Sequence, residues 1–495
     1  MSMPANTAFP SFDFSALAGL GVAVARLATD SRKVRRGDTF IACPGEQSDG
    51  RQYIPAAIAA GSNAVLWERA GFEWKDEWRV PNLAVDDLRG KAGVIAEQVY
   101  GAPSEKLWMV GITGTNGKTS CAHWLAQALT SLGKQCAVVG TLGNGFPGAL
   151  EYSPNTTPDA VVLHEQLSAY LAAGAQCAAM EVSSHGLAQG RVNGVHFNVA
   201  LLTNLSRDHL DYHGDMASYA AAKAGLFAWP NLKFAVLNLD DPFGEELAGK
   251  LGCSGVQTVG YSLEGKRDNV HHVVLGRDLK LSAAGIEFEV VTPWGSAHLA
   301  SRMLGRFNAQ NLLATLAALL VSGVELKAAV HALEQAEPVA GRLQKFGGGA
   351  KPLVVVDYAH TPDALEKVLQ TLREVTPGKL ICVFGCGGGR DKGKRPLMGA
   401  AASKLADEAI VTSDNPRHEA PLAIIDDIVA GMGGNYHVIE DRALAIEEAL
   451  RRAAPQDVVV VAGKGHEDYQ EIGGCRLPFS DAEVAARLLA EYRAC

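Results

Sequence analysis

The sequence predicts an α/β protein of several domains, and three observations lead to that prediction. The 495 residues exceed the usual size of one domain and suggest about three by length alone. Apolar runs of strand length alternate with helical patterns, which is typical of parallel sheets covered by helices. Polar and glycine-rich segments directly follow several of those runs. We therefore predict three domains, at residues 1–104, 105–337 and 338–495.

The first predicted domain is a small α/β domain. Strand-like and helical runs alternate in it, at residues 39–42, 53–60, 64–67, 83–85 and 91–100. Residues 29–54 are dense in hydroxyl, basic and glycine residues, a composition typical of a solvated surface loop. Loops of this kind can also bind a phosphorylated sugar nucleotide through hydroxyls and backbone N–H groups. A cluster of glycine, proline and serine before residue 105 marks the domain boundary.

The second predicted domain begins with the most informative segment of the chain. An apolar run at residues 107–110 leads into GTNGKT, residues 114–119, and apolar residues at helical spacing follow. Glycines let the backbone approach an anion, the helix N-terminus and Lys118 supply positive charge, and the hydroxyl of Thr119 can hold Mg²⁺. The strict phosphate-loop pattern fails because Ile112 stands in place of its first glycine. The segment still predicts a nucleoside triphosphate site rather than an ordinary turn.

Other strands of this domain also end in polar side chains. Short strands are predicted at residues 137–140, 177–182 and 199–203, and NTTPDA (residues 155–160) opens a helix with capping residues. The strand at 177–182 leads into EVSSHGL and the strand at 199–203 into NLSRDHLDYHG. Because working residues lie where parallel strands end, these segments should face the same crevice as Lys118.

Two of these strand ends suggest a metal site. Mg²⁺ prefers oxygen ligands, and an imidazole can complete its shell. Thr119, Glu181 and His209 are therefore the candidate ligands. For His209 a hydrogen-bonded structural role is equally consistent with the sequence.

Two later helices carry further candidates. Lys223 lies in the alanine-rich helix SYAAAKAGLF, where a lysine is usually a solvated charge. Asn308 and Asn311 stand at the start of a long apolar helix that begins just after them. Their amides suit the hydrogen-bond pattern of a purine, while helix capping is the alternative.

The third predicted domain repeats the alternation of strands and helices. Its apolar strands are predicted at residues 353–356, 380–384, 409–412 and 458–461. They end in DYAHTPDAL, GCGGGRDKGKR, SDNPRHE and AGKGHEDYQ, respectively. Four strands that deliver polar and glycine residues at the same end predict a doubly wound, Rossmann-like sheet with a site along one edge. Flexible surface loops are the competing interpretation.

The composition excludes several classes of partner. The net charge of −9 argues against nucleic acid or an anionic membrane as the main partner. No uninterrupted apolar run approaches the ~20 residues of a membrane span, and no secretory signal is recognisable. The nine cysteines are scattered, as in proteins of a reducing compartment. We expect a cytoplasmic protein, and we expect it to be a monomer.

These motifs together carry a resemblance to a known family. GTNGKT, EVSSHGL, TNLSRDHLDYHG, the YAAAK lysine, GRFNAQN, DYAHTPDAL, GCGGGRDKGKRP, DNPR and GKGHEDYQ occur in the order found in the Mur ligases, and the chain resembles them from about Thr29 to its last helix. The resemblance implies an N-terminal UDP-sugar-binding domain, a central P-loop-type ATP-binding domain and a C-terminal amino-acid-binding domain.

The resemblance also implies an activity in bacterial cell-wall synthesis. ATP would activate the free D-glutamate carboxylate of UDP-N-acetylmuramoyl-L-alanyl-D-glutamate as an acyl phosphate. The amine of meso-2,6-diaminopimelate would then displace phosphate, giving an amide, ADP and phosphate. A folylpolyglutamate synthetase, a P-loop kinase or GTPase, and a non-catalytic ATP-binding module are the alternatives.

Site residues follow from the resemblance position by position. The catalytic residues would be Lys118, Glu181, His209 and Lys223, and the metal ligands Thr119, Glu181, His209 and Lys223 as a carbamate formed with CO2. ATP would contact Gly114, Thr115, Asn116, Gly117, Lys118, Thr119, Ser120, Asn308, Asn311, Arg342, Asp357 and His360. The UDP-sugar dipeptide would contact Thr29, Ser31, Glu46, Gln47, Ser48, Asn155, Thr156, Thr157, Ser183, Gln189 and Arg191, where Glu46 replaces the usual histidine of the family. Diaminopimelate would contact Arg390, Asp414, Asn415, Pro416, Arg417, Gly463 and Glu467.

Two of these assignments have a chemical rationale of their own. Carbamylation requires a neutral amine, so burial or a nearby cation must lower the pKa of Lys223. The planar guanidinium of Arg417 can pair with the distal carboxylate of diaminopimelate, whereas it would repel the distal ammonium of L-lysine. Glu467 would pair with the ammonium of the substrate.

Overall fold

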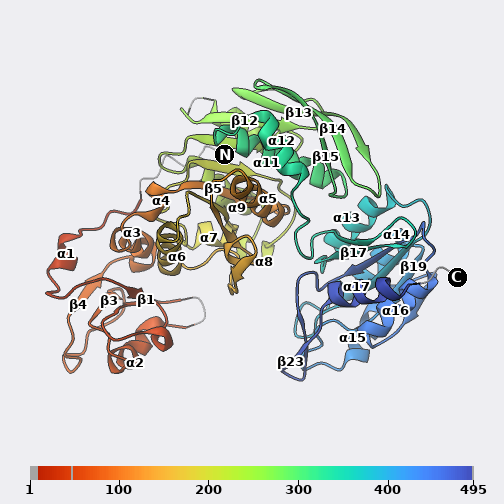
Figure 1. Ribbon diagram of the computed structural model, residues 1–495. Helices are drawn as coiled ribbons and strands as arrows, with labels where there is room; N and C mark the ends of the chain where they lie inside the picture. Colours follow the sequence, from red (N-terminus) through yellow and green to blue (C-terminus); the bar gives the residue numbers. More distant parts are fainter. Residues whose placement is uncertain (1–8, 46–47, 253, 493–495) are drawn as a thin grey trace. The chain divides into compact units, whose positions relative to one another are not determined.

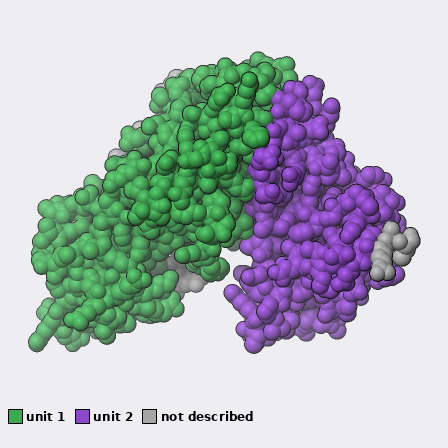
Figure 2. Space-filling view, in the orientation of Figure 1, with its two compact units in different colours: residues 1–277, 290–297, 310–333 green, residues 278–289, 298–309, 334–495 purple. Residues whose placement is uncertain are grey.

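The structure is a computed structural model that describes residues 9–45, 48–252 and 254–492 (Figure 1). The chain forms two compact units, one of residues 1–277, 290–297 and 310–333 and the other of residues 278–289, 298–309 and 334–495 (Figure 2). The described residues build three large sheets, which helices cover, and one two-stranded sheet, so the predicted three-domain α/β fold is confirmed. The domain boundaries at residues 104 and 337 stay predictions.

The first sheet is small and wholly parallel. The elements of this region are α1 (Ser15–Ala18), β1 (Leu27–Ala28), η1 (Ser31–Lys33), β2 (Thr39–Ala42), η2 (Gly50–Tyr53), α2 (Ile54–Ala59), β3 (Ala64–Glu68), β4 (Asn82–Val85), α3 (Leu88–Val99) and α4 (Pro103–Lys106). The strands pair in the order β1-β2-β3-β4. Every residue of β2 and β3 is buried, as expected for parallel strands covered on both faces. The strands predicted at 39–42, 64–67 and 83–85 are confirmed to within one residue.

The second sheet has eleven strands. Its strands and the helices around them are β5 (Trp108–Thr113), α5 (Lys118–Ser131), β6 (Cys136–Gly140), β7 (Gly143–Phe146), β8 (Ala149–Glu151), α6 (Ala160–Ala172), β9 (Cys177–Glu181), α7 (Ser184–Ala188), β10 (Val199–Leu202), α8 (Leu210–His213), α9 (Met216–Ala224), η3 (Gly225–Ala228), β11 (Phe234–Asn238), α10 (Pro242–Leu251), β12 (Gln257–Ser262), β13 (His272–Leu281), β14 (Ile286–Thr292), β15 (Gly295–Ser301), α11 (Arg306–Val321) and α12 (Leu326–Glu334). The sequence predicts β5, β6, β9 and β10 but none of β7, β8 and β11 to β15.

The strand order of this sheet positions the site. The order is β15-β14-β13-β12-β11-β10-β5-β9-β6-β7-β8. The four neighbours β10, β5, β9 and β6 are parallel, so their carboxyl ends lie at one edge. Asp159 caps α6 by accepting from the backbone N–H groups of Val161 and Val162, as the NTTPDA segment predicts.

The third sheet confirms the doubly wound prediction. Its elements are β16 (Gln344–Gly347), β17 (Leu353–Asp357), α13 (Pro362–Arg373), β18 (Leu380–Phe384), α14 (Lys394–Leu405), β19 (Glu408–Val411), α15 (Pro421–Val429), β20 (Tyr436–Val438), α16 (Arg442–Arg452), β21 (Val458–Ala462), β22 (Tyr469–Ile472), β23 (Cys475–Pro478) and α17 (Asp481–Glu491). Strands β17, β21, β18, β19 and β20 are parallel neighbours, β16 joins β17 antiparallel, and β22 and β23 form a separate hairpin.

Successive residues of these strands pack on opposite faces of the sheet. Val355 and Val460 lie in a core with residues of α13, α14 and α15, whereas Val354 and Val459 lie in a core with residues of α16 and α17. Because side chains alternate along a strand, an uninterrupted apolar strand needs helices on both faces.

Helix α11 begins earlier than the sequence predicts. It starts at Arg306, so Asn308 and Asn311 lie inside its first two turns and are not its caps. The prediction that the helix starts after these two residues is wrong.

Among the described residues, no helix has the length and apolar character needed to cross a bilayer.

Candidate active site

The GTNGKT turn joins β5 to α5 and has the backbone of an anion-binding loop. Gly114 and Gly117 have φ angles of +144° and +90°, which other residues rarely adopt. A Cβ at Gly114 would lie 1.9 Å from Thr203 Oγ1, and one at Gly117 would lie 2.4 Å from Asn311 Oδ1. Both positions therefore require glycine, and Asn311 lies beside the loop.

The end of β10 holds this loop in place. The Thr203 hydroxyl donates to the Asn116 carbonyl at 2.6 Å, and Asn116 N donates to the Asn204 side chain at 3.0 Å. Thr115 Oγ1 donates to the Ser206 carbonyl at 3.1 Å. The predicted meeting of the β5 and β10 ends is confirmed.

Lys118 and Lys223 approach the loop from two elements. Lys118 Nζ donates to the carbonyls of Gly114 and Thr115, at 2.8 and 2.9 Å. Lys223 Nζ, on α9, donates to the Gly114 carbonyl at 2.8 Å and lies 4.6 Å from the centre of the Tyr219 ring. Lys223 is 1% exposed, so the alternative that it is a solvated charge is wrong.

The surroundings of Lys223 favour its neutral form. Burial, followed by the positive charge of Lys118, lowers the pKa of Lys223 well below its usual value. A neutral amine is nucleophilic, whereas an ammonium is not. The structure therefore meets the chemical requirement for carbamylation at this position.

Glu181, at the end of β9, is a fully buried carboxylate with three donors. It accepts from Thr119 Oγ1 at 3.0 Å, from Thr141 N at 2.8 Å and from Thr141 Oγ1 at 3.1 Å. A Cβ at Gly140 would lie 2.2 Å from Glu181 Oε1, so this position also requires glycine. Thr141 is not among the residues predicted from the sequence, although it directly follows the predicted strand at 137–140.

His209 precedes α8 with a left-handed backbone, φ +53°. Its ring centre lies 4.7 Å from that of His185 and 6.1 Å from that of Tyr219. Burial and the charges of Lys118 and Lys223 lower the pKa of His209, against the opposite effect of Asp208. Near neutral pH the imidazole is therefore mostly neutral, the form that binds a metal.

The residues predicted for the UDP-sugar dipeptide in this unit form one hydrogen-bonded group. Thr157 Oγ1 and Ser183 Oγ lie 3.0 Å apart, and Arg191 donates to the Thr157 carbonyl at 2.9 Å and to Gln189 Oε1 at 2.7 Å. Thr156 Oγ1 lies 3.0 Å from Thr141 Oγ1, which connects the group to Glu181.

The remaining predicted residues of this group are less closely joined. Thr29 Oγ1 donates to Asp159 Oδ2 at 3.4 Å, and the Asn155 carbonyl accepts from Ser153 at 2.8 Å. Ser31 lies on η1, and Ser48 is exposed. Glu46 and Gln47 lie outside the described residues.

Three residues predicted for ATP gather around the end of β17 in the second unit. The Arg342 guanidinium lies 5.1 Å from the Tyr358 ring centre. The Asp357 carboxylate accepts from the N–H groups of Leu343 and Ala359, both at 2.8 Å. The pKa of Asp357 is raised, because the effect of burial exceeds the opposite effect of the Arg342 charge. His360 is exposed, with Nδ1 2.7 Å from the Tyr358 carbonyl.

Asn308 has a local partner in the same unit. Its Nδ2 donates to the Leu304 carbonyl at 2.9 Å. The side chain is 3% exposed, and its predicted contact with ATP stays a prediction.

The DNPR segment and the GKGHED segment lie together in the second unit. Asn415 Nδ2 donates to Glu467 Oε2 at 2.8 Å, and a Cβ at Gly463 would lie 2.9 Å from Asp414 Oδ2. The fully buried Lys464 ammonium donates to Asn415 Oδ1 at 3.1 Å and to Glu467 Oε2 at 3.0 Å. Lys464 is not among the residues predicted from the sequence, although it lies in the GKGHED segment.

Arg417 is held by its backbone and by its side chain. The backbone of Arg417 is left-handed, with a φ of +53°. Its N–H donates to the Glu471 carbonyl at 2.9 Å, and its carbonyl accepts from Gly473 N at 2.6 Å. Glu471 and Gly473 lie in the β22–β23 hairpin. Arg417 Nη1 donates to the Gly388 carbonyl at 2.6 Å, and Arg417 Nε lies 3.4 Å from Glu471 Oε2. A Cβ at Gly387 would lie 3.0 Å from Arg417 Nη1 and 3.9 Å from Arg390 Cγ, so the side chains of both arginines lie beside this glycine.

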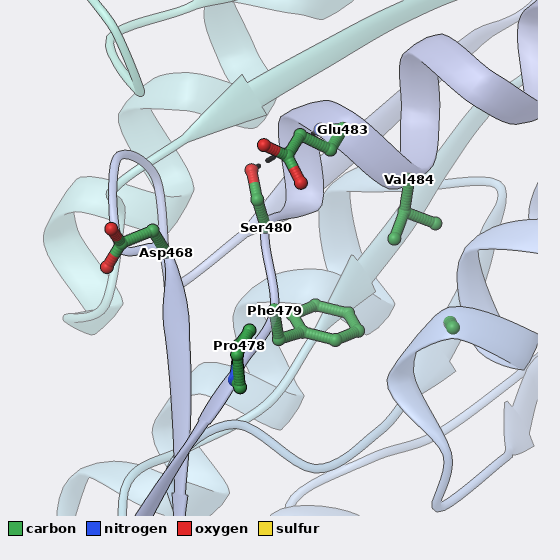
Figure 3. Close-up of a pocket in the computed structure, with 7 residues that line it drawn as sticks. Asp468, Pro478, Phe479, Ser480, Glu483 and Val484 are labelled. Carbon is green, nitrogen blue, oxygen red and sulfur yellow. Dashed lines mark hydrogen bonds between the residues drawn. The ribbon is translucent and has the colours of Figure 1, made fainter.

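A cavity of about 450 Å³ in the second unit lies elsewhere (Figure 3). Asp468, Phe479 and Val484 line it, together with Ser480, which caps α17 by accepting from Glu483 N at 3.3 Å. None of its lining residues is a predicted site residue. It has no part in the site described above.

The glycine turn between β5 and α5, with Lys118 at the start of that helix, defines an α/β protein of the phosphate-loop class. Three family models match the chain: "Mur ligase family, catalytic domain" at residues 23–100, "Mur ligase middle domain" at 112–319 and "Mur ligase, glutamate ligase domain" at 341–465. The chain belongs to the Mur ligase family.

Individual relatives agree with this assignment. The chain is 52% identical to the UDP-N-acetylmuramoyl-L-alanyl-D-glutamate–2,6-diaminopimelate ligase of Chromobacterium violaceum, over 98% of each chain. It is 50% identical to the ligase of the same name from Pseudomonas aeruginosa, over 99% of each. A solved structure of a ligase of that name matches with a TM-score of 0.70 and 39% identity, over 94% of this chain and 95% of the other. A folylpolyglutamate synthase from Mycobacterium tuberculosis shares the fold at 20% identity, with a TM-score of 0.60, over 75% of this chain and 91% of its own.

Proposed function

We propose that this protein is an ATP-dependent ligase that joins meso-2,6-diaminopimelate to UDP-N-acetylmuramoyl-L-alanyl-D-glutamate in peptidoglycan biosynthesis, releasing ADP and phosphate. The observation that carries the proposal is that one chain holds the phosphate loop, the buried Lys223, and Arg417 hydrogen-bonded to the Gly388 carbonyl. Relatives that bear this ligase name and are 50–52% identical over nearly the whole chain support it.

The loop would bind the triphosphate. Glycines at positions 114 and 117 let the backbone come close to phosphate oxygens, and the N-terminus of α5 adds partial positive charge. The Lys118 ammonium, which donates hydrogen bonds to two loop carbonyls in this structure, would donate instead to oxygens of the β- and γ-phosphates. Positioning and charge neutralisation would supply most of the catalysis.

The residues proposed for magnesium fit that ion. Thr119 Oγ1 and Glu181 Oε2 lie 3.0 Å apart. Adjacent oxygens of an octahedral magnesium shell are separated by about 3 Å, because each lies about 2.1 Å from the ion. His209 would add a neutral imidazole nitrogen. When bound, Mg²⁺ would neutralise charge on the phosphates as they are transferred.

Lys223 would act as a carbamate. Its neutral amine would attack CO2, forming an N–C bond and losing a proton, and the product would carry a negative charge in place of a positive one. The lowered pKa of Lys223 supports this step. The anion could then hold a second Mg²⁺ near the acyl phosphate.

The amino acid would be selected in the second unit. Arg417 and Arg390 flank the Gly387 loop, where they would pair with the distal carboxylate of diaminopimelate. The acidic side of the same pocket, with Asp414 and Glu467, would accept the distal ammonium. L-lysine has no carboxylate for Arg417 and would be rejected.

The test is phosphate release from purified protein supplied with ATP, Mg²⁺, the UDP-muramoyl dipeptide and a panel of amino acids. We expect release only when the nucleotide peptide and meso-diaminopimelate are both present. Equal rates with L-lysine would contradict the proposed selectivity, and phosphate release with folate and glutamate would favour the folylpolyglutamate synthase alternative. The monomeric state and the cytoplasmic location stay predictions from the sequence.

A further inference from the structure

Lys464 is a buried cation that the proposed reaction does not use directly. It follows β21, and its side chain is 0% exposed. Its Nζ lies 3.0 Å from Glu467 Oε2, 3.1 Å from Asn415 Oδ1 and 3.7 Å from Asp414 Oδ1. The ring of Tyr469, with its centre 5.5 Å away, covers another side. The proposed function assigns two of these four neighbours, Asp414 and Glu467, to the amino acid, and the sequence predicts that Asn415 also contacts it.

A buried ammonium destabilises a protein unless its surroundings compensate its charge. Here two carboxylates and an amide oxygen do so. The same contacts fix those groups: Asn415 Oδ1 also accepts from Glu471 N at 2.9 Å, and Asn415 Nδ2 donates to Glu467. The orientation of the Asn415 amide is therefore specified on both sides, and the Glu467 carboxylate has two donors.

The charge balance of this cluster depends on Lys464. Asp414 and Glu467 contribute two negative charges, and Lys464 cancels one. The net charge of minus one matches a single substrate ammonium. Without Lys464 the cluster would carry two negative charges and would repel the distal carboxylate of a diacid more strongly.

We propose that Lys464 is a positioning residue that sets the amino-acid preference of this ligase by orienting Asn415 and Glu467 and by limiting the negative charge of the pocket. The inference rests on the proposed function. Because Lys464 is fully buried, it acts through these partners and does not touch the substrate. The favoured substrate class is an amino acid whose distal end carries both an ammonium and a carboxylate.

The experiment compares the full-length wild type with Lys464→Met, which has similar length and no charge, and Lys464→Gln, which keeps a donor. We expect the KM for meso-diaminopimelate to rise about tenfold or more in Lys464→Met and less in Lys464→Gln. The KM for ATP should stay within about twofold. The ratio of kcat/KM for meso-diaminopimelate to that for L-lysine should fall about tenfold, because the more negative pocket disfavours the diacid.

A double-mutant cycle separates positioning from general destabilisation. If Lys464 acts through Glu467, Lys464→Met should raise the KM for meso-diaminopimelate little further in a Glu467→Gln background. Lys379→Met is the matched control, because Lys379 also pairs with a carboxylate, Glu408 at 2.9 Å, in the same unit. It should leave all three kinetic quantities unchanged.

The outcomes distinguish this inference from the proposed function. An unchanged substrate ratio, an equal rise in both KM values, or additive effects in the cycle would overturn the role of Lys464. A wild type that releases no phosphate with meso-diaminopimelate would overturn the proposed function instead. If Lys464→Met does not fold, as judged by its melting curve, the ratio and the cycle are measured with Lys464→Gln.

Discussion

The side-chain nitrogens of Lys118 and Lys223 donate to the same atom, the carbonyl oxygen of Gly114, each at 2.8 Å. Two ammonium groups at one acceptor repel each other, and only one of them is deeply buried. Lys223 is therefore the residue that gives up its proton more easily, as the lowering of its pKa indicates. Converting it to a carbamate would change the repulsion into attraction.

The first prediction concerns Lys223 itself. Lys223→Arg keeps a cation that cannot be carbamylated, so phosphate release should fall about 100-fold or more. With ¹³C-labelled bicarbonate, wild type should show a carbamate NMR signal that the variant lacks. Lys233→Arg, which changes a lysine 5.2 Å from the Trp108 ring centre, should keep both signal and activity. A variant that retains full activity would refute the carbamate.

The second prediction concerns Gly117. Gly117→Ala places a Cβ 2.4 Å from Asn311 Oδ1 at a φ of +90°, so the loop must shift and the KM for ATP should rise about tenfold or more. Gly133→Ala is the control, because Gly133 has a φ of +82° and no atom within 4 Å of an added Cβ. Both variants should lose about 1 kcal/mol of unfolding free energy from the backbone conformation. A similar KM for ATP in the two variants would show that the contact with Asn311 is unimportant.

The third prediction concerns Arg417. Arg417→Ala should raise the KM for meso-diaminopimelate roughly 30-fold or more, equivalent to about 2 kcal/mol, because a charged hydrogen-bonding partner of the substrate is removed. The KM for ATP should change far less. Arg451→Ala removes an exposed arginine paired with Glu448 and should change neither constant. Equal effects of Arg417→Ala on both substrates would defeat the assignment.

The fourth prediction concerns pH and His196, whose Nε2 lies 2.6 Å from Glu97 Oε1. The hydrogen bond with Glu97 raises the pKa of His196. Because the folded-state pKa is higher, the stabilisation is complete below the unfolded value near 6.5 and is lost as pH rises through the folded value. The unfolding free energy of wild type at pH 5.5 should exceed that of His196→Gln by about 1 kcal/mol, measured by denaturant unfolding. The difference should shrink by pH 9, and a constant difference would contradict the ion pair.

The sequence predicts well where strands carry long apolar runs. β18 is found at residues 380–384 as predicted, and β2 at 39–42, because uninterrupted burial leaves an unmistakable pattern. The strands β13 to β15 are missed; in β14, for example, buried and exposed residues alternate, and such a half-exposed strand has a weaker signal.

Residues of the proposed site can be located from the sequence where a local motif is sufficient. They are missed where their burial depends on contacts with residues far away along the chain. GTNGKT specifies its own turn, so Lys118 and Thr119 could be placed from the sequence. The burial of Lys464 depends on Asn415, 49 residues away, and no local pattern reveals that contact. Lys223 lies in an ordinary helix, so its own residues suggest a solvated charge and only the family resemblance gives it a role; its burial depends on the distant Gly114.

The β22–β23 hairpin could change the position of Arg417, and with it the proposed choice of amino acid, without a substitution at Arg417 itself. It bonds to the main chain of Arg417 on both sides of that residue, yet several of its own side chains face solvent. Exchanging hairpin sequences between related enzymes would thus redirect a guanidinium without replacing it. Directed evolution of such enzymes could begin there, because a change at an exposed position of β23 opens no cavity in the core.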